Sequence, residues 1–289
     1  MKLSKSIGII GKGFVGSAVK HGFTCDKNFK AKIKIYDKDS SLRTHSLNDT
    51  VNKSSIVFIS IPTPANLNGS INLKIIDELL NDINLCYNGK SILLLRSTLV
   101  PGSSKKFAKK YPKLKIVFNP EFLTERNANH DFINQSRVIL GGEKELTQIV
   151  AKLYKERFGN SLPIVETNFE TAEMIKYMNN CFLATKVSFM NEMKIISDKT
   201  DVNWEQAVKA FNLDPRMGNS HFNVPGHDGK IGFGGSCLPK DIQALIYFAS
   251  TLKIDSRVLK AVWETNVSLR PEKDWEKLKG RAVSSDNSD

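Results

Sequence analysis

The chain has 289 residues, of which 40% are hydrophobic and 25% charged, and its mean hydropathy is −0.27. These values are typical of globular material, and the length predicts about two domains of ~100–200 residues each. No apolar run approaches the ~18 residues of a membrane-spanning helix. Residues 1–6 lack the apolar core of a signal peptide. We therefore expect neither a secreted nor a membrane-spanning protein.

The formal charge is +12, from 42 basic and 30 acidic residues. An excess of this kind can attract anionic ligands such as nucleotides, or nucleic acid. No block of lysine and arginine interleaved with aromatic residues is present, which favours lysines spread over solvated faces. We expect no nucleic-acid partner, and the charge by itself does not identify a ligand.

The four cysteines stand far apart in the sequence, at Cys25, Cys86, Cys181 and Cys237. No two have the CxxC spacing of zinc or redox sites, and four in a chain of this length do not make a disulfide framework. The pattern predicts reduced thiols in a cytoplasmic protein, with no metal site.

Short apolar runs alternate with amphipathic stretches over the first ~165 residues, which is the pattern of a Rossmann-type, doubly wound parallel α/β sheet. The predicted strands are Ile7–Ile10, Lys32–Tyr36, Ile56–Ile61, Ser91–Arg96, Lys115–Asn119, Arg137–Leu140 and Pro163–Glu166. Gly, Asn, Pro and Ser follow several of these runs, at the strand ends where such sheets bind ligands.

After residue 167 the hydrophobic period becomes that of a helix. The predicted helical ranges are 172 to about 199, Asn203–Phe211 and, after a Gly- and Pro-rich loop at Asn219–Gly235, 239 to about 279. The expected organisation is an α/β domain over 1–167, a mostly helical central domain over 168–279, and a frayed polar tail over 280–289.

A glycine-rich segment, Gly11-Lys-Gly13-Phe-Val-Gly16, follows the first predicted strand and opens a helix. Asp37 stands 21 residues beyond Gly16, at the end of the second strand, which completes a dinucleotide-binding pattern. Gly11 permits a tight turn, Gly13 lets a pyrophosphate approach the backbone, and Gly16 lets the helix pack on the strand. The Asp37 carboxylate would accept hydrogen bonds from a ribose 2′-hydroxyl and repel a 2′-phosphate, which favours NAD over NADP.

The segment Gly232-Phe-Gly-Gly-Ser-Cys237-Leu-Pro-Lys-Asp241 contains three glycines whose backbone could lie close to a phosphate or a sugar. Pro239 suits the first turn of a helix, which places Cys237 beside a helix N-terminus with Lys240 nearby. Such a position lowers the pKa of a thiol and favours a thiolate nucleophile. Asp241, four residues later, would face the same side of the helix. The other three cysteines are interpreted as small buried hydrophobic residues.

Two further pairs have the same spacing of four residues. Glu121 and Glu125 follow a predicted strand and would share one side of any helical turn. Lys176 and Asn180 share one face of the first helix of the second domain. The neighbours of Lys176 are unusually apolar, so we expect this lysine to be partly buried.

Together these residues resemble the UDP-glucose/GDP-mannose dehydrogenase family over nearly the whole chain, from the glycine loop to about Arg270. The resemblance rests on Gly11–Gly16, Ser60–Pro64, Ser97–Pro101, Asn119–Glu125, Glu173–Asn180, Arg216–Gly218 and Gly232–Asp241. It implies an NAD-dependent nucleotide-sugar dehydrogenase that oxidises a primary alcohol to a carboxylate with two NAD molecules in turn. The expected substrate is UDP-glucose and the expected product UDP-glucuronate.

The catalytic residues that the resemblance implies are Cys237, Lys176, Asn180, Asp241, Glu121 and Thr98. Lys176 and Asn180, with a water held by Asp241, would stabilise the alkoxide and the later oxyanions. Cys237 would trap the aldehyde as a thiohemiacetal, which a second hydride transfer would convert to a thioester. Glu121 would assist the water that hydrolyses the thioester.

The same resemblance implies two sets of binding residues. Those implied for NAD are Gly11, Gly13, Phe14, Val15, Gly16, Asp37, Ser60, Pro62, Thr63, Pro64, Thr98, Glu125 and Lys240. Those implied for the substrate are Glu121, Phe122, Leu123, Lys176, Asn180, Arg216, Lys230, Phe233 and Gly234. In this family Arg216 would act from the neighbouring subunit of a homodimer formed through the helical domain.

Members of the family usually continue into a third domain that holds much of the nucleotide. Here Leu278–Val283 resembles the start of that domain's first strand, shortly before the sequence ends. This leaves open the same chemistry on another sugar nucleotide, such as GDP-mannose or a UDP-N-acetylhexosamine, or a binding subunit without turnover. A β-hydroxyacid dehydrogenase would share the glycine loop and the helical domain, but its two-electron reaction would not require Cys237.

Overall fold

The structure, a computed structural model, describes residues 5–218 and 220–285. The chain forms two compact units. The N-terminal unit comprises the residues up to Thr63 together with Leu73–Lys176, and the C-terminal unit comprises Pro64–Asn72 together with the residues from Tyr177 onward. The predicted order, a Rossmann-type α/β domain followed by a mostly helical domain, is confirmed.

Within the described residues the N-terminal unit contains a seven-stranded sheet in the order β2-β1-β3-β4-β5-β6-β7. Its strands are β1 Ser6–Ile10, β2 Lys32–Tyr36, β3 Ile56–Ile59, β4 Ile92–Leu95, β5 Lys115–Phe118, β6 Val138–Gly142 and β7 Ile164–Thr167. All seven agree with the predicted strands to within two residues at each end. The order reverses between β1 and β3, the point of such a sheet where ligands bind beyond the carboxyl ends of the strands.

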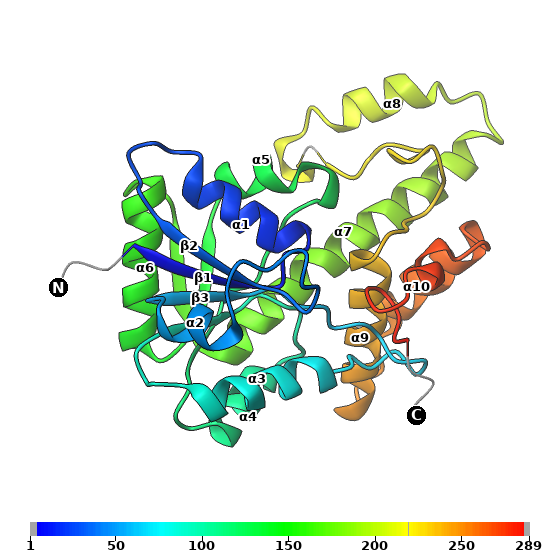
Figure 1. Cartoon of the computed structure of the whole chain (residues 1–289). Coiled ribbons are helices and arrows are strands. Elements are labelled where there is room, and N and C mark those ends of the chain that lie inside the picture. Colours follow the sequence, from blue (N-terminus) through cyan, green and yellow to red (C-terminus); the bar gives the residue numbers. More distant parts are fainter. Residues whose placement is uncertain (1–4, 219, 286–289) are drawn as a thin grey trace. The chain divides into compact units, whose positions relative to one another are not determined.

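Helices cover both faces of this sheet, so its central strands are apolar on both sides, and every residue of β3 and β4 is buried. Along β3, Ile56 and Phe58 belong to one core and Val57 and Ile59 to the other. The first core is covered by α1 Phe14–Thr24, α5 Ala128–Ile133 and α6 Lys144–Phe158. The second is covered by α2 Leu47–Asn52, α3 Lys74–Cys86 and α4 Ser103–Lys110. Figure 1 shows α1 and α5 on the side of the sheet opposite α3 and α4.

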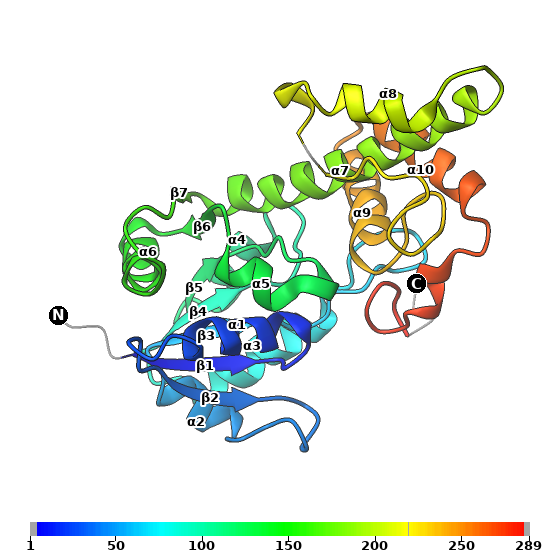
Figure 2. The ribbon, with the colours of Figure 1, turned by 90° about the horizontal axis from the view of Figure 1, so that it is seen from above.

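The sequence predicts a sheet that is parallel throughout, and this is wrong at one pair of strands, because β6 runs antiparallel to β5. The connection between them, residues 119–137, includes the short 3₁₀ helix η1 (Glu125–Asn127) and α5. Antiparallel neighbours need no crossover connection over the face of the sheet. β6 and β7 are again parallel, joined through α6. Figure 2 shows β6 and β7 at the end of the sheet that α6 covers. An apolar run reads the same in either direction, so the sequence pattern does not contain the orientation of β6.

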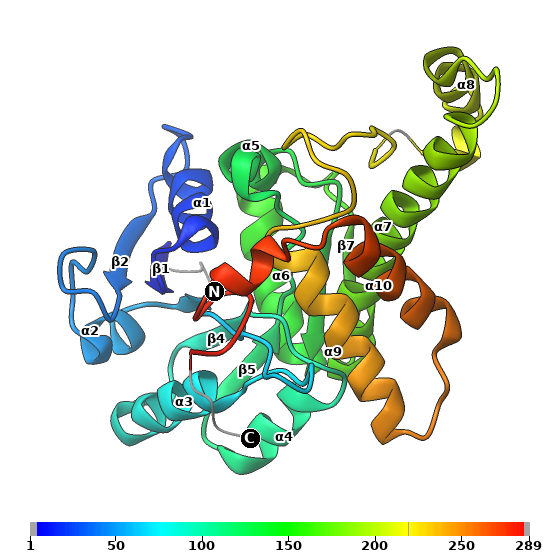
Figure 3. The same cartoon turned by 90° about the vertical axis from the view of Figure 1, so that its right-hand side faces the viewer.

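The C-terminal unit is mostly helical, with α7 entering it from the N-terminal unit. Its helices are α7 Phe169–Ser197, α8 Trp204–Phe211, α9 Cys237–Thr251 and α10 Arg257–Leu269, with the 3₁₀ helices η2 Pro215–Met217 and η3 Asp274–Lys277. α9 and α10 lie side by side (Figure 3), and the Ser188 hydroxyl of α7 donates to the Val262 carbonyl of α10 at 3.2 Å. In the part of the chain that the structure describes, no helix has the length and apolar run needed to cross a bilayer.

The compact units differ from the predicted division in two respects. The N-terminal unit extends into α7 as far as Lys176, because a continuous helix carries no mark where its packing partners change. In addition, Pro64–Asn72 belongs to the C-terminal unit, where the Ala65 amide donates to the Ala282 carbonyl at 3.0 Å. Ala282 is buried and the Ser284 amide donates to the Ala65 carbonyl at 2.7 Å, so this stretch is held against Pro64–Asn72 instead of forming part of the predicted frayed tail. Residues 286–289 of that tail lie outside the described residues.

Candidate functional site

In the glycine loop after β1, two positions have no room for a side chain, and a third faces open space. Gly11 has a φ of +87°, and a Cβ there would overlap the Ser60 carbonyl. A Cβ on Gly16 would overlap the Gly11 carbonyl and lie 3.2 Å from Ile9. Nothing lies within 4 Å of the place where a Cβ on Gly13 would stand. The last position leaves room for a ligand against the backbone.

The first turn of α1, with Phe14 and Val15, has the properties of an anion site. Gly13 is its N-cap, no described side chain caps it, and no acidic residue stands in its first turn. One oxygen of the Asp37 carboxylate accepts the Lys12 amide at 2.6 Å, so this acid is turned toward the glycine loop. The arrangement fits a dinucleotide with its pyrophosphate at the helix and a ribose at Asp37.

Replacing Asp37 with alanine is expected to weaken NAD binding roughly 10- to 100-fold, the effect of losing hydrogen bonds to a charged acceptor. The preference for NAD over NADP should fall as well, because the repelling carboxylate is gone. Calorimetric titration with both dinucleotides measures this. The control is Asp39→Ala, which removes a neighbouring carboxylate that accepts from Ser41. Equal NAD affinity in the wild type and Asp37→Ala would show that the ribose lies elsewhere.

The loops after β3 and β4, which carry further predicted cofactor residues, are joined to each other. Thr63 is buried, and its hydroxyl donates to the Thr98 carbonyl at 3.0 Å. The Ser97 hydroxyl donates to the Ile61 carbonyl at 2.6 Å, beside Pro62. In the part of the chain that is described, the buried hydroxyl of Ser60 has no hydrogen-bond partner, as expected of a group that waits for a ligand.

Beyond β5, a buried ion pair joins Glu121 to Lys176 of α7. The Lys176 ammonium lies 2.8 Å from Oε1 of Glu121 and 2.6 Å from the Glu121 carbonyl oxygen. Lys176 is only 2% exposed, more deeply buried than the sequence predicts. A buried ammonium requires a partner charge, and Glu121 supplies it. A cavity of about 240 Å³ in this unit is lined in part by Glu121, Phe122 and Leu123.

The expectation that Glu121 and Glu125 share one side of a helical turn is wrong. No helix includes residues 119–124, and Glu125 begins the 3₁₀ helix η1 with an exposed side chain. The Leu123 amide is bound at 2.7 Å by the Glu121 side chain, a local bond that replaces a helical one. The two acids therefore face different surroundings.

Glu173 has a role that the sequence analysis did not identify. It is fully buried, and its carboxylate accepts the amides of Gly102 at 2.6 Å and Ser104 at 2.7 Å, at the start of α4. Burial raises the pKa of Glu173 to about 7, against these two hydrogen bonds, which favour the ionised form. The signal in the sequence was a second charged residue three positions before Lys176, on the same face of α7.

This raised pKa predicts a pH-dependent contribution to stability. The folded state binds the Glu173 proton more tightly than the unfolded state, so its contribution to the free energy of unfolding falls as pH rises from about 4.5 to 7. The total is about 3 kcal/mol. We expect Glu173→Gln to lose this part of the slope in urea unfolding at pH 5, 6, 7 and 8. Glu170→Gln, on the exposed side of α7, is the control, and equal slopes in Glu173→Gln and the wild type would contradict the assignment.

In the C-terminal unit, Asp241 is the centre of a buried polar group at the start of α9. It is 1% exposed, and its two oxygens accept from the Asn180 amide at 2.6 Å and the Lys240 ammonium at 2.5 Å. Asn180 and Lys240 are buried as well. Lys240, predicted to contact the cofactor, is thus engaged by the neighbouring acid.

Cys237 is the first residue of α9, with Pro239 in the same turn, and its side chain is half-buried. It therefore occupies the helix N-terminus, a position that stabilises a thiolate. Burial raises the pKa of the Cys181 thiol, and it also raises that of Cys86. Those two cysteines have the surroundings of inert thiols, whereas Cys237 lies at a helix N-terminus. Cys25 is exposed, so the expectation that it is a buried hydrophobic residue is wrong.

The remaining predicted substrate residues lie in the C-terminal unit, in the loop before α9 and in η2. Lys230, Phe233 and Gly234 belong to the loop before α9, where Phe233 is buried and the Lys230 ammonium pairs with Glu272 at 2.8 Å. Arg216 lies in η2, mostly exposed and paired with Asp214. Pro64, predicted to contact NAD, belongs to this unit as well.

The glycines of the loop before α9 were predicted to leave room for a phosphate or a sugar. At two of them, that room is filled by other side chains of this protein. A Cβ on Gly232 would lie 2.6 Å from the Asn266 side chain, and one on Gly234 would overlap the Arg270 guanidinium. Only Gly235 has nothing within 4 Å of that position. Asn266 and Arg270 are buried polar residues four positions apart, a spacing that marks one face of a helix and could have identified them.

The predicted site residues thus form one set in each unit. The set in the N-terminal unit is Gly11, Gly13, Phe14, Val15, Gly16, Asp37, Ser60, Pro62, Thr63, Thr98, Glu121, Phe122, Leu123, Glu125 and Lys176. The set in the C-terminal unit is Pro64, Asn180, Arg216, Lys230, Phe233, Gly234, Cys237, Lys240 and Asp241.

Comparison with known families matches both units. Residues 24–158 match the NAD binding domain of the UDP-glucose/GDP-mannose dehydrogenase family, and residues 170–268 match its central domain. UDP-glucose 6-dehydrogenase of Rickettsia prowazekii is 31% identical over 92% of this chain and 67% of its own length. The chain belongs to the UDP-glucose/GDP-mannose dehydrogenase family. Its N-terminal unit therefore contains the family's NAD-binding domain.

Other members of the family show how far the likeness extends. UDP-glucose 6-dehydrogenase of Rickettsia bellii is 34% identical over 90% of this chain and 66% of its own length. A UDP-glucose dehydrogenase structure from Pyrobaculum islandicum has a TM-score of 0.81 and 26% identity, covering 94% of this chain and 70% of that one. The chain thus spans slightly less than two thirds of the length of the Rickettsia bellii relative.

Proposed function

We propose that the chain catalyses the NAD-dependent oxidation of UDP-glucose to UDP-glucuronate. The observation that carries this proposal is Cys237 at the N-terminus of α9, four residues before a buried Asp241 that is bound to Asn180 and Lys240. A simple two-electron alcohol oxidation has no use for a nucleophilic thiol, whereas oxidation to an acid does. The names of the related enzymes support UDP-glucose as the substrate.

In the first oxidation, the C6 hydroxyl loses its proton and the C6 carbon loses a hydride, which gives an aldehyde. NAD, when bound, accepts the hydride in each of the two oxidations. Lys176 and Asn180 stabilise the negative charge that develops on the sugar oxygen, and Asp241 holds the water that takes the proton. The buried ammonium of Lys176 is held in place by Glu121, so it need not reorganise as the charge develops.

In the second oxidation, the Cys237 thiolate adds to the aldehyde carbon and forms a thiohemiacetal. Loss of a second hydride from that carbon leaves a thioester on Cys237. Water then attacks the thioester carbonyl with the assistance of Glu121, and the C–S bond breaks to release the carboxylate and the thiol. Two further residues of the N-terminal unit belong to the proposed site: Thr98, which is proposed to act in catalysis and to contact NAD, and Glu125, which is proposed to contact NAD.

We also propose a homodimer formed through the helical unit, with Arg216 of one subunit acting on the substrate of the other. α7 supports this, because Met178, Phe182, Phe189 and Ile196 are each at least half exposed and lie on one face. An exposed apolar stripe of this kind favours association with another apolar surface. Light scattering that gives the mass of one chain would contradict the dimer.

The test is to mix the purified chain with NAD and UDP-glucose and to count the NADH formed per sugar consumed. Two NADH per sugar, with UDP-glucuronate as product, is the expected result. One NADH per sugar would contradict the thioester route. Turnover with GDP-mannose or a UDP-N-acetylhexosamine alone would replace the proposed substrate, and no turnover with any of them would favour a binding subunit.

A further inference from the structure

The loop that leads into Cys237 is held in place by side chains. Among the described residues, no backbone–backbone hydrogen bond involves Ile231–Gly235. Instead the Asn266 side chain accepts the Phe233 amide at 2.6 Å and donates to the Phe233 carbonyl at 2.9 Å. Asn191 of α7 accepts the Gly232 amide at 3.2 Å. The conformation of this loop therefore depends on residues distant in the sequence.

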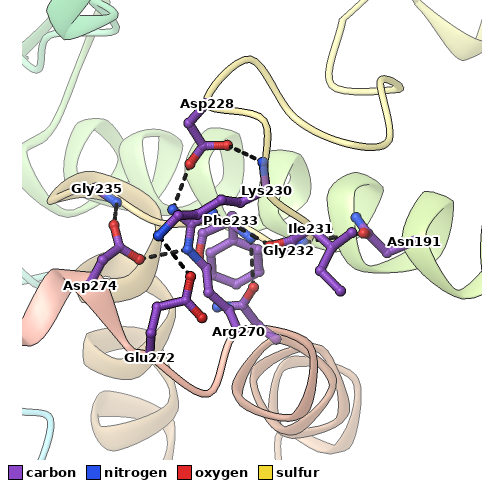
Figure 4. Close-up of polar contacts among 11 residues, drawn as sticks. Asn191, Asp228, Lys230, Ile231, Gly232, Phe233, Gly235, Arg270, Glu272 and Asp274 are labelled. Carbon is purple, nitrogen blue, oxygen red and sulfur yellow. Dashed lines mark hydrogen bonds and ion pairs between the residues drawn. The ribbon is translucent and has the colours of Figure 1, made fainter.

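Arg270, just after α10, connects both ends of the loop. Its guanidinium donates to Asp228 at 2.5 Å, before the glycines, and to Asp274 at 2.6 Å. Asp274 in turn accepts the Gly235 amide at 3.4 Å, two residues before Cys237. Figure 4 shows the guanidinium between these two carboxylates, with Phe233 beside it.

The arrangement is buried and specific to the shape of arginine. The Arg270 side chain is 3% exposed, and its planar guanidinium presents donors in two directions, whereas a lysine would offer a single point charge. Partial burial works to raise the pKa of Asp228 and Asp274, yet Arg270 outweighs it and holds both below their usual range. A side chain at Gly234 would occupy the space of the guanidinium. The glycine and the arginine are therefore required together.

A second ion pair joins the same segments at the surface. The Lys230 ammonium lies 2.8 Å from Glu272, and both side chains are more than one third exposed. Exposed pairs of this kind contribute little to stability, because water screens them. This pair offers a comparison for the buried one, since it connects the same loop to the same part of the chain.

We propose that Arg270 is the positioning residue of the cysteine loop. Through Asp228 at one end and Asp274 and Gly235 at the other, it sets the path of the backbone into α9 and so the orientation of the Cys237 thiol. The inference deepens the proposed function, on which it rests, because a thiolate must meet the aldehyde carbon in one geometry. Displacement of a reacting group by about 1 Å can cost roughly 10²-fold in rate.

The test compares Arg270→Lys, Asp274→Asn and the control Glu272→Gln. The first measurement is the rate at which iodoacetamide alkylates Cys237 between pH 6 and 9, followed by mass spectrometry of the Cys237 peptide. The second is NADH formation, separated into kcat and KM for NAD. We expect Arg270→Lys to shift the pH profile of alkylation and to lower kcat roughly 10-fold or more, with KM for NAD unchanged. Glu272→Gln should match the wild type in both.

The outcomes separate this inference from the proposed function. A folded Arg270→Lys with the alkylation profile and kcat of the wild type would overturn the inference. A shifted profile in a protein that turns over no sugar nucleotide would uphold the inference and overturn the function. If Arg270→Lys does not fold, Asp274→Asn decides, because it keeps the pair with Asp228 and removes the charge at the Gly235 end. An unshifted profile in that variant would overturn the inference as well.

Discussion

Cys237→Ser is expected to abolish acid formation, lowering the rate at which the acid forms by about 10³-fold or more and leaving at most one NADH per sugar consumed. A serine hydroxyl is a far weaker acid than a thiol, so it does not supply the anionic nucleophile that a thiolate provides at the start of α9. No thiohemiacetal can then form, and the second hydride has no covalent adduct to leave from. The measurement is NADH absorbance together with chromatography of the sugar products.

Matched variants make this result specific to the thiol at the start of α9. Cys86→Ser and Cys25→Ser change other cysteines, one half-buried and one exposed, and should keep the rate of the wild type. Full conversion to the acid by Cys237→Ser would exclude the covalent route. Release of free aldehyde by that variant would instead place the block at the second oxidation, in agreement with the proposal.

Lys176→Met is expected to abolish turnover and to lower the free energy of unfolding by roughly 3–5 kcal/mol, the typical cost of breaking a buried ion pair. The substitution removes the ammonium that lies 2.8 Å from Glu121 and leaves that carboxylate buried without its partner. Urea unfolding measures the loss of stability, and the NADH assay measures the loss of activity. The control is Lys105→Met, which breaks an exposed pair with Glu170 and should leave stability nearly unchanged.

The double variant Glu121→Gln/Lys176→Met separates the two roles of the lysine. Removing the stranded charge should restore most of the stability, because a neutral amide costs less to bury than a carboxylate. Activity should stay absent, since the charge that stabilises the alkoxide and the acid that assists hydrolysis of the thioester are both missing. Restored activity in the double variant would show that Lys176 acts only by neutralising Glu121.

The local features of the fold followed from the sequence. Apolar runs bounded by Gly, Pro and Asn predicted all seven strands, and at β3 and β4 the run is continuous because a strand covered on both faces is apolar throughout. The turn at Gly11 and the helix beginning near Cys237 were likewise predictable, since they depend on the conformational limits of glycine and proline. The cysteine and lysine motifs also named the family correctly.

Contacts between distant parts of the chain came only from the tertiary structure. The direction of β6, the burial of Lys176 against Glu121 and the placement of Pro64–Asn72 in the C-terminal unit are of this kind. So is the connection of Arg270 to both ends of the cysteine loop. Periodicity and turn chemistry record the environment of each residue along its own element. Which charges meet in the interior depends on how elements separated by tens of residues pack, and single-sequence patterns do not contain that information.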